Sequence, residues 1–204
     1  MMISLALLAI FVVVTFALWR EGLWSAAIAV LNVLLAASFA TAWFESAVAL
    51  LEPRLPSYGY LLDFICIWGL FAVILLALRE VSDRVSATKV KFRRPVEMFA
   101  TPVVAAIAAW IVVCFTAATL HTAALPRDFI QATPEARMFF GLAPDRRWLQ
   151  WVRGSTLHGP FGRPDHAFDT DTVAKGTGSD FIIRYAVRRK RLEAEPELRV
   201  AVTK

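Results

Sequence analysis

The sequence has little charge in its first 125 residues, which hold only eight Lys or Arg and seven Asp or Glu side chains. Residues 126–204 carry fourteen and ten of these side chains. In a soluble domain, about a quarter of the residues are charged, so the low charge of the first part excludes it from that class. The chain therefore divides into a membrane domain, residues 1–125, and a polar tail, residues 126–204.

Cysteines and catalytic motifs are also scarce. The two cysteines, Cys66 and Cys114, lie inside apolar runs, which excludes a disulfide framework and a CxxC metal site. The sequence has no G-x-S-x-G, no P-loop, no H-E-x-x-H and no Rossmann glycine pattern, and each of these motifs serves a definite chemistry. We therefore predict that the protein is not an enzyme and needs no cofactor or metal ion.

Four long apolar runs are the main feature that is present. A bilayer core about 30 Å thick needs about 20 helical residues to cross it, and the runs predict spans at 2–19, 22–51, 58–79 and 97–125. The first run lacks a basic start and a small-residue cleavage site before Arg20, which favours an anchor over a signal peptide. The predicted fold is an all-α membrane protein, with four transmembrane helices in a bundle and a mostly irregular C-terminal tail with short helices.

The second run carries small or polar residues at helical spacing. These helix-packing candidates recur four, three, four and four residues apart, at Ser25, Ala29, Asn32, Ala36 and Ala40. Small residues let helix backbones approach closely in lipid, and an amide can hydrogen-bond across helices. This role is favoured for Asn32 over a place on a transport path.

Three acids lie near or within the apolar runs: Glu45, Glu52 and Asp63. Intramembrane acids are functional candidates. Each of these is close to a predicted helix end, where water and headgroups lower the cost of a charge, so a structural or interfacial role is favoured.

Basic residues predict the orientation. Seven lie in the first turn and in residues 79–97, namely Arg20, Arg79, Arg84, Lys89, Lys91, Arg93 and Arg94. Only Arg54, Arg127 and Arg137 lie near the membrane on the other side. The positive-inside rule then places residues 79–97 in the cytoplasm and the tail outside, in the periplasm. The cluster at 188–191 is far along the chain from the last span and is discounted.

The tail is predicted to hold short helices at about 134–153 and 180–192 and a flexible loop at 154–179. Pro144 begins a helix within the first of these segments and Gly154 is expected to end it. Trp148 and Trp151 alternate with arginines there, which favours a place in the membrane interface, although packing on the bundle or on a partner is an equal alternative. Arg20 and Trp24 are the other interface candidates.

The loop contains several side chains able to bind metal, at His158, Asp165, His166, Asp169 and Asp171. Their spacing matches neither a closed zinc pattern nor a calcium loop. A solvated loop is therefore favoured.

The order of these features resembles the colicin V production protein (CvpA) family. The shared features are a short anchor, a basic residue and glycine before the second helix at Arg20 and Gly22, a basic loop and an alanine-rich fourth span. Residues 138–146 and 180–185 are similar to long-tailed members. The family's early acid in the first span is absent, and the entry to the fourth span, 98–102, lacks its glycines. The resemblance implies an inner-membrane protein linked to toxin production or export and to envelope homeostasis.

Three functions follow as hypotheses. The leading one is a non-enzymatic accessory or scaffold factor, the second a small transporter or channel subunit using Asn32 and Asp63, and the last an enzyme using the tail histidines. The expected partners are the lipid bilayer, anionic headgroups at residues 79–97, a protein of the membrane or envelope, and a second copy of the chain. No nucleic-acid partner is expected.

Overall fold

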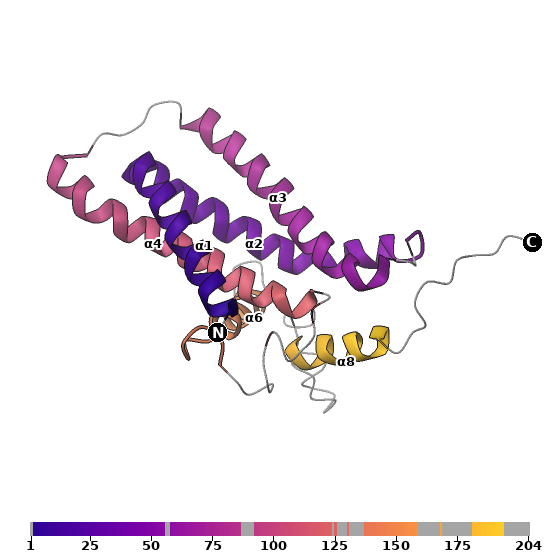
Figure 1. Ribbon diagram of the computed structural model, residues 1–204. Coiled ribbons are helices and arrows are strands. Elements are labelled where there is room, and N and C mark those ends of the chain that lie inside the picture. The colour runs from indigo at the N-terminus through magenta and orange to yellow at the C-terminus, as the bar shows by residue number, and fades with distance from the viewer. Residues whose placement is uncertain are drawn as a thin grey trace, which may run out of the picture.

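The computed structural model describes residues 2–55, 58–86, 92–123, 125, 130, 137–158, 168 and 181–193, and within these the chain is helical and has no strand. The elements are α1 (Met2–Glu21), α2 (Leu23–Leu51), α3 (Gly59–Val85), α4 (Arg94–Thr119), the 3-10 turn η2 (Leu120–Thr122), α6 (Pro144–His158) and α8 (Phe181–Glu193). The first four form the bundle, and the tail helices α6 and α8 lie against it (Figure 1).

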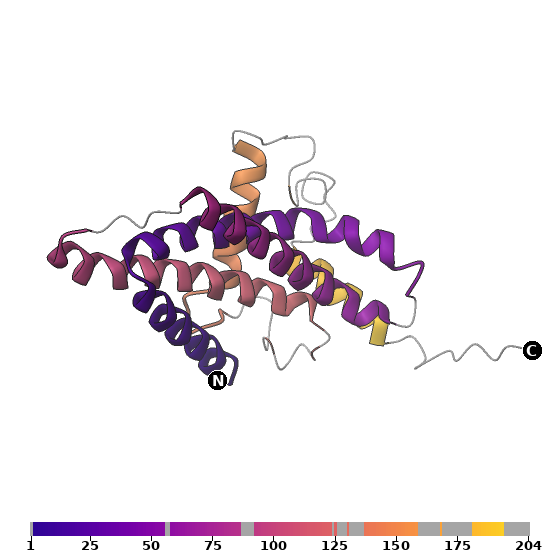
Figure 2. The same cartoon turned by 90° about the horizontal axis from the view of Figure 1, so that it is seen from above.

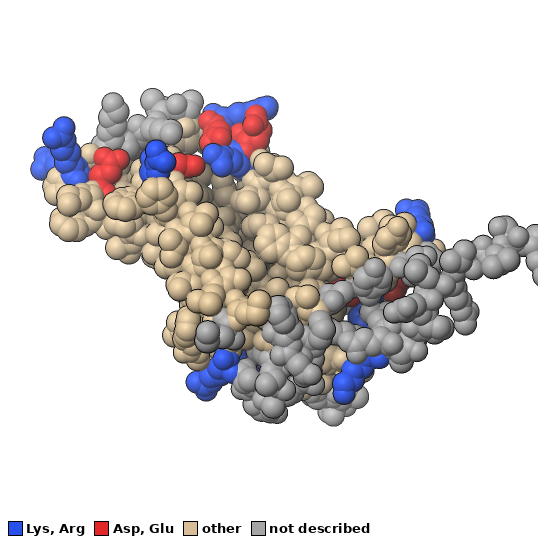
Figure 3. Space-filling model, in the orientation of Figure 1, with Lys and Arg blue, Asp and Glu red and all other residues tan. Residues whose placement is uncertain are grey.

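Helices α1 to α4 are each long and apolar enough to cross a membrane. α2 has 29 residues, about 43 Å of helix, which exceeds a bilayer core of about 30 Å. On the face shown in Figure 3, charged side chains gather at two opposite ends and leave an uncharged belt between them. The chain is an all-α, multi-pass membrane protein, which confirms the predicted fold class.

α3 and α4 extend further towards the loop that joins them than their hydropathy indicates. α3 was expected to end at residue 79 but continues to Val85. Ion pairs support these extra turns: Arg79 with Glu21 and with Asp83, and Arg84 with Glu80. α4 likewise begins at Arg94 instead of residue 97, but it ends at Thr119 instead of residue 125 and is followed by the turn η2. Hydropathy marks where hydrocarbon contact ends, whereas backbone hydrogen bonding continues beyond it.

Gly22 makes the sharp turn between α1 and α2. Its φ is +90°, a conformation that residues with a Cβ rarely adopt. A Cβ here would also lie 3.3 Å from Glu97 Oε1 on α4. Backbone conformation and close packing therefore both favour glycine at the start of α2.

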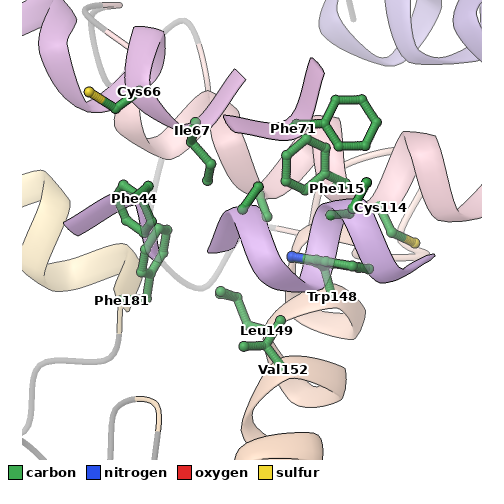
Figure 4. Packing of buried hydrophobic residues seen from close by; sticks show 14 of the residues in the cluster. Phe44, Cys66, Ile67, Phe71, Cys114, Phe115, Trp148, Leu149, Val152 and Phe181 are labelled. Carbon is green, nitrogen blue, oxygen red and sulfur yellow. The ribbon is translucent and has the colours of Figure 1, made fainter. Parts of the chain in front are cut away.

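α4 and α2 hold more buried residues than any other described helix. α4 packs against α1, α2 and α6, while α2 packs against α3. Four alanines of α4 have no exposed surface, at positions 105, 108, 109 and 117. Larger side chains fill the core beside them, including Phe71 and Phe115, whose ring centroids are 4.7 Å apart (Figure 4). Small residues thus permit close helix contacts, and aromatic rings fill the remaining space.

α1 is the least buried span. Leu7 is its one buried residue among those described, and it packs with Val113, Ala117 and Phe139. Leu5, Val12 and Val13 are exposed. Most of the α1 surface is therefore left for lipid or for another protein.

The first tail helix is shorter at its start and longer at its end than predicted. The expected start at residue 134 lies outside the described residues, and residues 138–142 form a turn in place of helix. α6 begins at Pro144, the expected helix start, but passes through Gly154 to His158. A single glycine weakens a helix by only about 1 kcal/mol relative to alanine, which the packing of α6 on the bundle offsets.

The tail packs into the bundle core, which for the first tail helix is one of the two alternatives that the sequence left open. Residues 154–158 of the predicted flexible loop are helical, and Phe168, further along it, is half-buried with its ring 5.7 Å from that of Phe181. Trp148 of α6 and Phe181 of α8 belong to the same core cluster as residues of α2, α3 and α4. The two tail helices are therefore parts of one packed structure with the spans.

Candidate functional site

Arg184 and Arg188 of α8 meet the three acids of the apolar segments. Arg184 Nη2 lies 2.7 Å from Glu45 Oε1. Arg188 Nε lies 2.9 Å from Asp63 Oδ2, and its Nη2 lies 3.2 Å from Glu52 Oε1. We call these five residues the tail–bundle charge cluster. It joins α2, α3 and α8 through charge-assisted hydrogen bonds, which are stronger than neutral ones.

The cluster is buried unevenly. The Asp63 side chain is 6% exposed, whereas that of Arg188 is 34% exposed. Burial lowers the pKa of Arg188, but the carboxylates of Asp63 and Glu52 outweigh this effect and raise the pKa above its ordinary value. Arg188 is therefore a permanent cation placed beside an acid that would otherwise be buried without a counter-charge.

Tyr185 sits between the two arginines in sequence and is buried in the core. Its hydroxyl donates to Glu45 Oε1 at 3.4 Å. Burial, and then the negative charges of Glu45 and Asp63, raise the pKa of the Tyr185 phenol far above its ordinary value. This side chain therefore remains neutral across the physiological range.

A second polar contact fixes α6 to the end of α4. His121 Nε2 lies 3.1 Å from Asp145 Oδ2, and both side chains are almost completely buried. Nearby, Trp148 Nε1 donates to Thr41 Oγ1 of α2 at 3.1 Å. Buried polar groups need such partners because leaving them unpaired costs free energy.

The helix-packing candidates lie on the inner side of α2 to different degrees. Ala36 and Ala40 have no exposed surface and Asn32 is buried, while Ser25 and Ala29 are half-buried. Asn32 Oδ1 accepts a hydrogen bond from Ser82 Oγ of α3 at 3.0 Å. The structure thus uses the Asn32 amide in a contact between helices.

The interface candidates are found in different environments. Arg20 is exposed and lies over the Phe16 ring, and Trp24 is half-buried and donates from Nε1 to Ser86 Oγ. Trp151 is exposed at 47%, but Trp148 is only 3% exposed and contacts Phe115. Protein therefore covers Trp148, which differs from the lipid contact expected of it.

The structure describes only some of the basic residues in 79–97. Arg79 and Arg84 are paired with acids, Arg93 and Arg94 are exposed, and Lys89 and Lys91 lie outside the described residues. Asp165, His166, Asp169 and Asp171 also lie outside them, while His158 is exposed. Within the described part of the chain, no group of three or more His, Cys, Asp or Glu side chains could hold a metal ion.

Sequence reasoning missed the partners of the acids and the buried histidine. The cluster at 188–191 was discounted as remote, yet Arg188 lies against Asp63. One signal of this contact was available in the sequence. In the last tail helix, Phe181, Arg184, Tyr185 and Arg188 recur at helical spacing, so aromatic and cationic side chains share one face. The acids Glu45, Glu52 and Asp63 carry the charge opposite to that of these arginines, which makes them their expected partners.

The chain was compared with protein-family models, with curated proteins and with solved structures, and it matches none of them. The geometry alone therefore defines the site. It joins a tail helix to a membrane bundle by paired charges, and those pairs involve Glu45, Glu52 and Asp63.

Proposed function

We propose that the protein is a CvpA-like accessory or scaffold factor of the inner membrane, without enzymatic activity, linked to toxin production or export and envelope homeostasis. Its tail is periplasmic in this proposal, and residues 79–97 face the cytoplasm. The proposed link to toxin production or export and to envelope homeostasis rests on the resemblance of the sequence to that family. The observation that carries the scaffold role is the packing of both tail helices into the bundle core.

The polar groups of the spans support a scaffold because they serve contacts between helices. Asn32 pairs with Ser82, joining α2 to α3. Asp63 and Glu52 pair with Arg188, joining α2 and α3 to the tail. A transport pathway needs polar groups that face water or solute, whereas these face one another.

The exposed side of α1 is the proposed site for a membrane partner. Leu5, Val12, Val13 and Phe16 are all more than half exposed, whereas Leu7 is buried. Helices in lipid associate through packing rather than through hydrophobic burial, so a partner helix can displace lipid here at little cost. A second copy of this chain or another envelope protein can take this place.

Deleting the gene in its own host tests the process. We expect less peptide toxin in the culture medium and greater detergent sensitivity of the envelope, and we expect the wild-type gene to restore both. Unchanged toxin secretion together with unchanged detergent sensitivity in the deletion strain would contradict the proposed role.

Photo-crosslinking in living cells tests the scaffold surface. A photoreactive amino acid at Val13 should give a discrete crosslinked protein, whereas one at the exposed Leu76 of α3 serves as a lipid-facing control. Identical patterns at both positions would contradict a partner on α1.

A small transporter or channel subunit is the second candidate. Asp63 favours it, because this acid is 4% exposed within an apolar span and such acids often mark ion paths. Proteoliposomes should show no ion flux above empty vesicles if the scaffold proposal holds. Flux that Asp63→Asn abolishes would establish the transporter instead.

A further inference from the structure

The turn before α6 holds two neighbouring phenylalanines on opposite sides. Phe139, Phe140 and Ala143 have φ values of 52°, 53° and 46°, and Gly141 has 87°. Residues with a Cβ rarely adopt such values. Two backbone hydrogen bonds close the turn, from Ala143 N to Met138 O and from Leu142 N to Phe139 O. As a result, Phe139 is buried, whereas Phe140 is 69% exposed.

Phe140 lies beside the membrane-spanning part of the protein. Its ring centroid is 5.4 Å from that of Phe139. Phe139 in turn packs with Leu7 of α1 and with Val113 and Ala117 of α4, and both helices are candidate spans. The exposed ring of Phe140 is therefore close to two candidate spans.

The exposed side of α6 continues this surface. Trp151 is half-exposed, and its Nε1 donates to Ser38 Oγ of the spanning helix α2 at 3.2 Å. Leu142 is exposed at the start of the helix. Figure 2 shows α6 crossing the bundle and projecting beyond the spans, where the helix would lie over the surrounding bilayer.

The exposed charge of the segment before and within α6 is positive. Residues 137–158 contain four arginines and a single acid, Asp145, and Asp145 has no exposed surface. Arg147 and Arg153 are exposed. Arg147 Nε also donates to Leu142 O at 3.3 Å, which holds a cation next to the exposed apolar turn.

From these observations we propose that Phe140, Leu142, Arg147, Trp151 and Arg153 form a binding surface for anionic phospholipids. Tryptophan and other aromatic side chains occupy the boundary between acyl chains and headgroups. Arginine binds phosphate through two parallel hydrogen bonds, and basic residues are attracted to an anionic membrane surface. The surface therefore matches both the apolar and the charged part of an anionic lipid.

A fluorescent label in the turn tests the proposal on the full-length protein. The native Cys66 and Cys114 are buried, so a thiol-reactive dye can be directed to Leu142→Cys. The protein is reconstituted into phosphatidylcholine bilayers that contain a minor fraction of either brominated phosphatidylglycerol or brominated phosphatidylcholine in both leaflets. We expect quenching by the anionic lipid to exceed quenching by the neutral lipid at least about twofold.

Charge variants then locate the interaction. Arg147→Gln with Arg153→Gln should abolish the excess, and Arg153→Gln alone should reduce it, which provides a readout if the double variant is unstable. As a control, Arg79→Gln with Arg84→Gln removes the same amount of charge from the other end of the bundle. This double variant should leave the excess quenching by the anionic lipid unchanged. Equal quenching by both lipids, or an excess that survives the loss of Arg147 and Arg153, would overturn the proposal. Absence of quenching by either lipid would also overturn it and would mean that a protein covers the turn.

Discussion

At the scale of single residues, Asp63 depends on a cation from a distant part of the sequence. Its carboxylate is buried within α3, and Arg188, its partner, is 125 residues away along the chain. Removing one member of a buried pair leaves the other charge without compensation, which costs more than the pair itself contributes. The pair therefore favours the docked position of α8, because Asp63 has no other cation in the tail–bundle charge cluster within ion-pair distance.

We expect Arg188→Gln to lower the free energy of unfolding by about 2–4 kcal/mol, because Asp63 stays buried without its cation. Asp63→Asn should cost less, and the double variant should cost less than the sum of the two. Denaturant unfolding in detergent, followed by circular dichroism, measures all three. Costs that add within about 0.3 kcal/mol would show that the residues are not coupled.

Arg184→Gln provides the matched comparison for this cycle. The side chain of its carboxylate partner, Glu45, is 46% exposed, against 6% for Asp63, and exposed ion pairs contribute only about 0–1 kcal/mol. A loss as large as that of Arg188→Gln would mean that exposure does not determine the strength of these pairs.

Tyr185 predicts how stability changes at high pH. Its folded-state pKa is raised above the ordinary value of 10.0, so only the unfolded chain releases this proton just above pH 10. The contribution to stability is complete below pH 10 and decreases as the pH rises further. Tyr185→Phe should show a smaller decrease in unfolding midpoint over this range than the wild type. Equal slopes for both proteins would contradict the burial of the phenol.

At the scale of elements, the two faces of α2 differ in how they tolerate substitution. Ala36 has no exposed surface, while Leu31 is 60% exposed. Ala36→Leu should cost about 1–3 kcal/mol by overpacking, and Leu31→Ala should be nearly neutral because lipid covers that site. Thermal unfolding in detergent measures the stability of both variants. Equal unfolding midpoints would contradict the assignment of Ala36 to the face that contacts other helices.

Two glycines of the tail should respond to alanine in opposite ways. A Cβ at Gly141 or at Gly154 would meet nothing within 4 Å, so neither substitution creates a clash. Gly141 has a φ of +87°, and Gly141→Ala should cost about 1–2 kcal/mol in backbone strain. Gly154 lies inside α6, and Gly154→Ala should contribute about 0.5–1 kcal/mol of stability. Unfolding curves for the two variants that shift in the same direction would contradict these backbone assignments.

The spans could be predicted from the sequence because long apolar runs have few alternatives in lipid. The start of α6 could be predicted because proline favours the first turn of a helix. The continuation past Gly154 and the docking of α8 could not. The first depends on the packing of α6 in the core, through residues such as Trp148, and the second on the contact of Arg188 with Asp63. Periodicity within a short segment indicates which of its side chains share a face, but it does not identify the distant residues that they contact.

At the scale of the whole molecule, the charged ends are asymmetric in composition. α8 brings arginines to the end that also holds Glu45, Glu52 and Asp63, so cations there are partly neutralised. The opposite end includes the exposed Arg93 and Arg94 besides its own ion pairs. Both ends carry exposed cations, because Arg147 and Arg153 lie at the tail end. The proposed cytoplasmic placement of residues 79–97 therefore rests on the count of basic residues near the spans.

Thiol labelling of intact cells tests this orientation. Asp83 and Gln150 are both exposed and lie at opposite ends of the bundle, while the native cysteines are buried. A membrane-impermeant maleimide should label Gln150→Cys and leave Asp83→Cys unmodified until the cells are permeabilised. The reverse pattern would place the tail in the cytoplasm.

The long sequence separation of the Asp63–Arg188 pair also has a consequence for biogenesis. Ribosomes add about 5–20 residues per second, so a gap of 125 residues delays Arg188 by roughly 6–25 s after Asp63 is made. During this interval the nascent spans hold an acid without its counter-charge, and the membrane quality-control proteases can recognise them. Premature termination before α8 should therefore yield a short-lived protein, even though every span has already been synthesised.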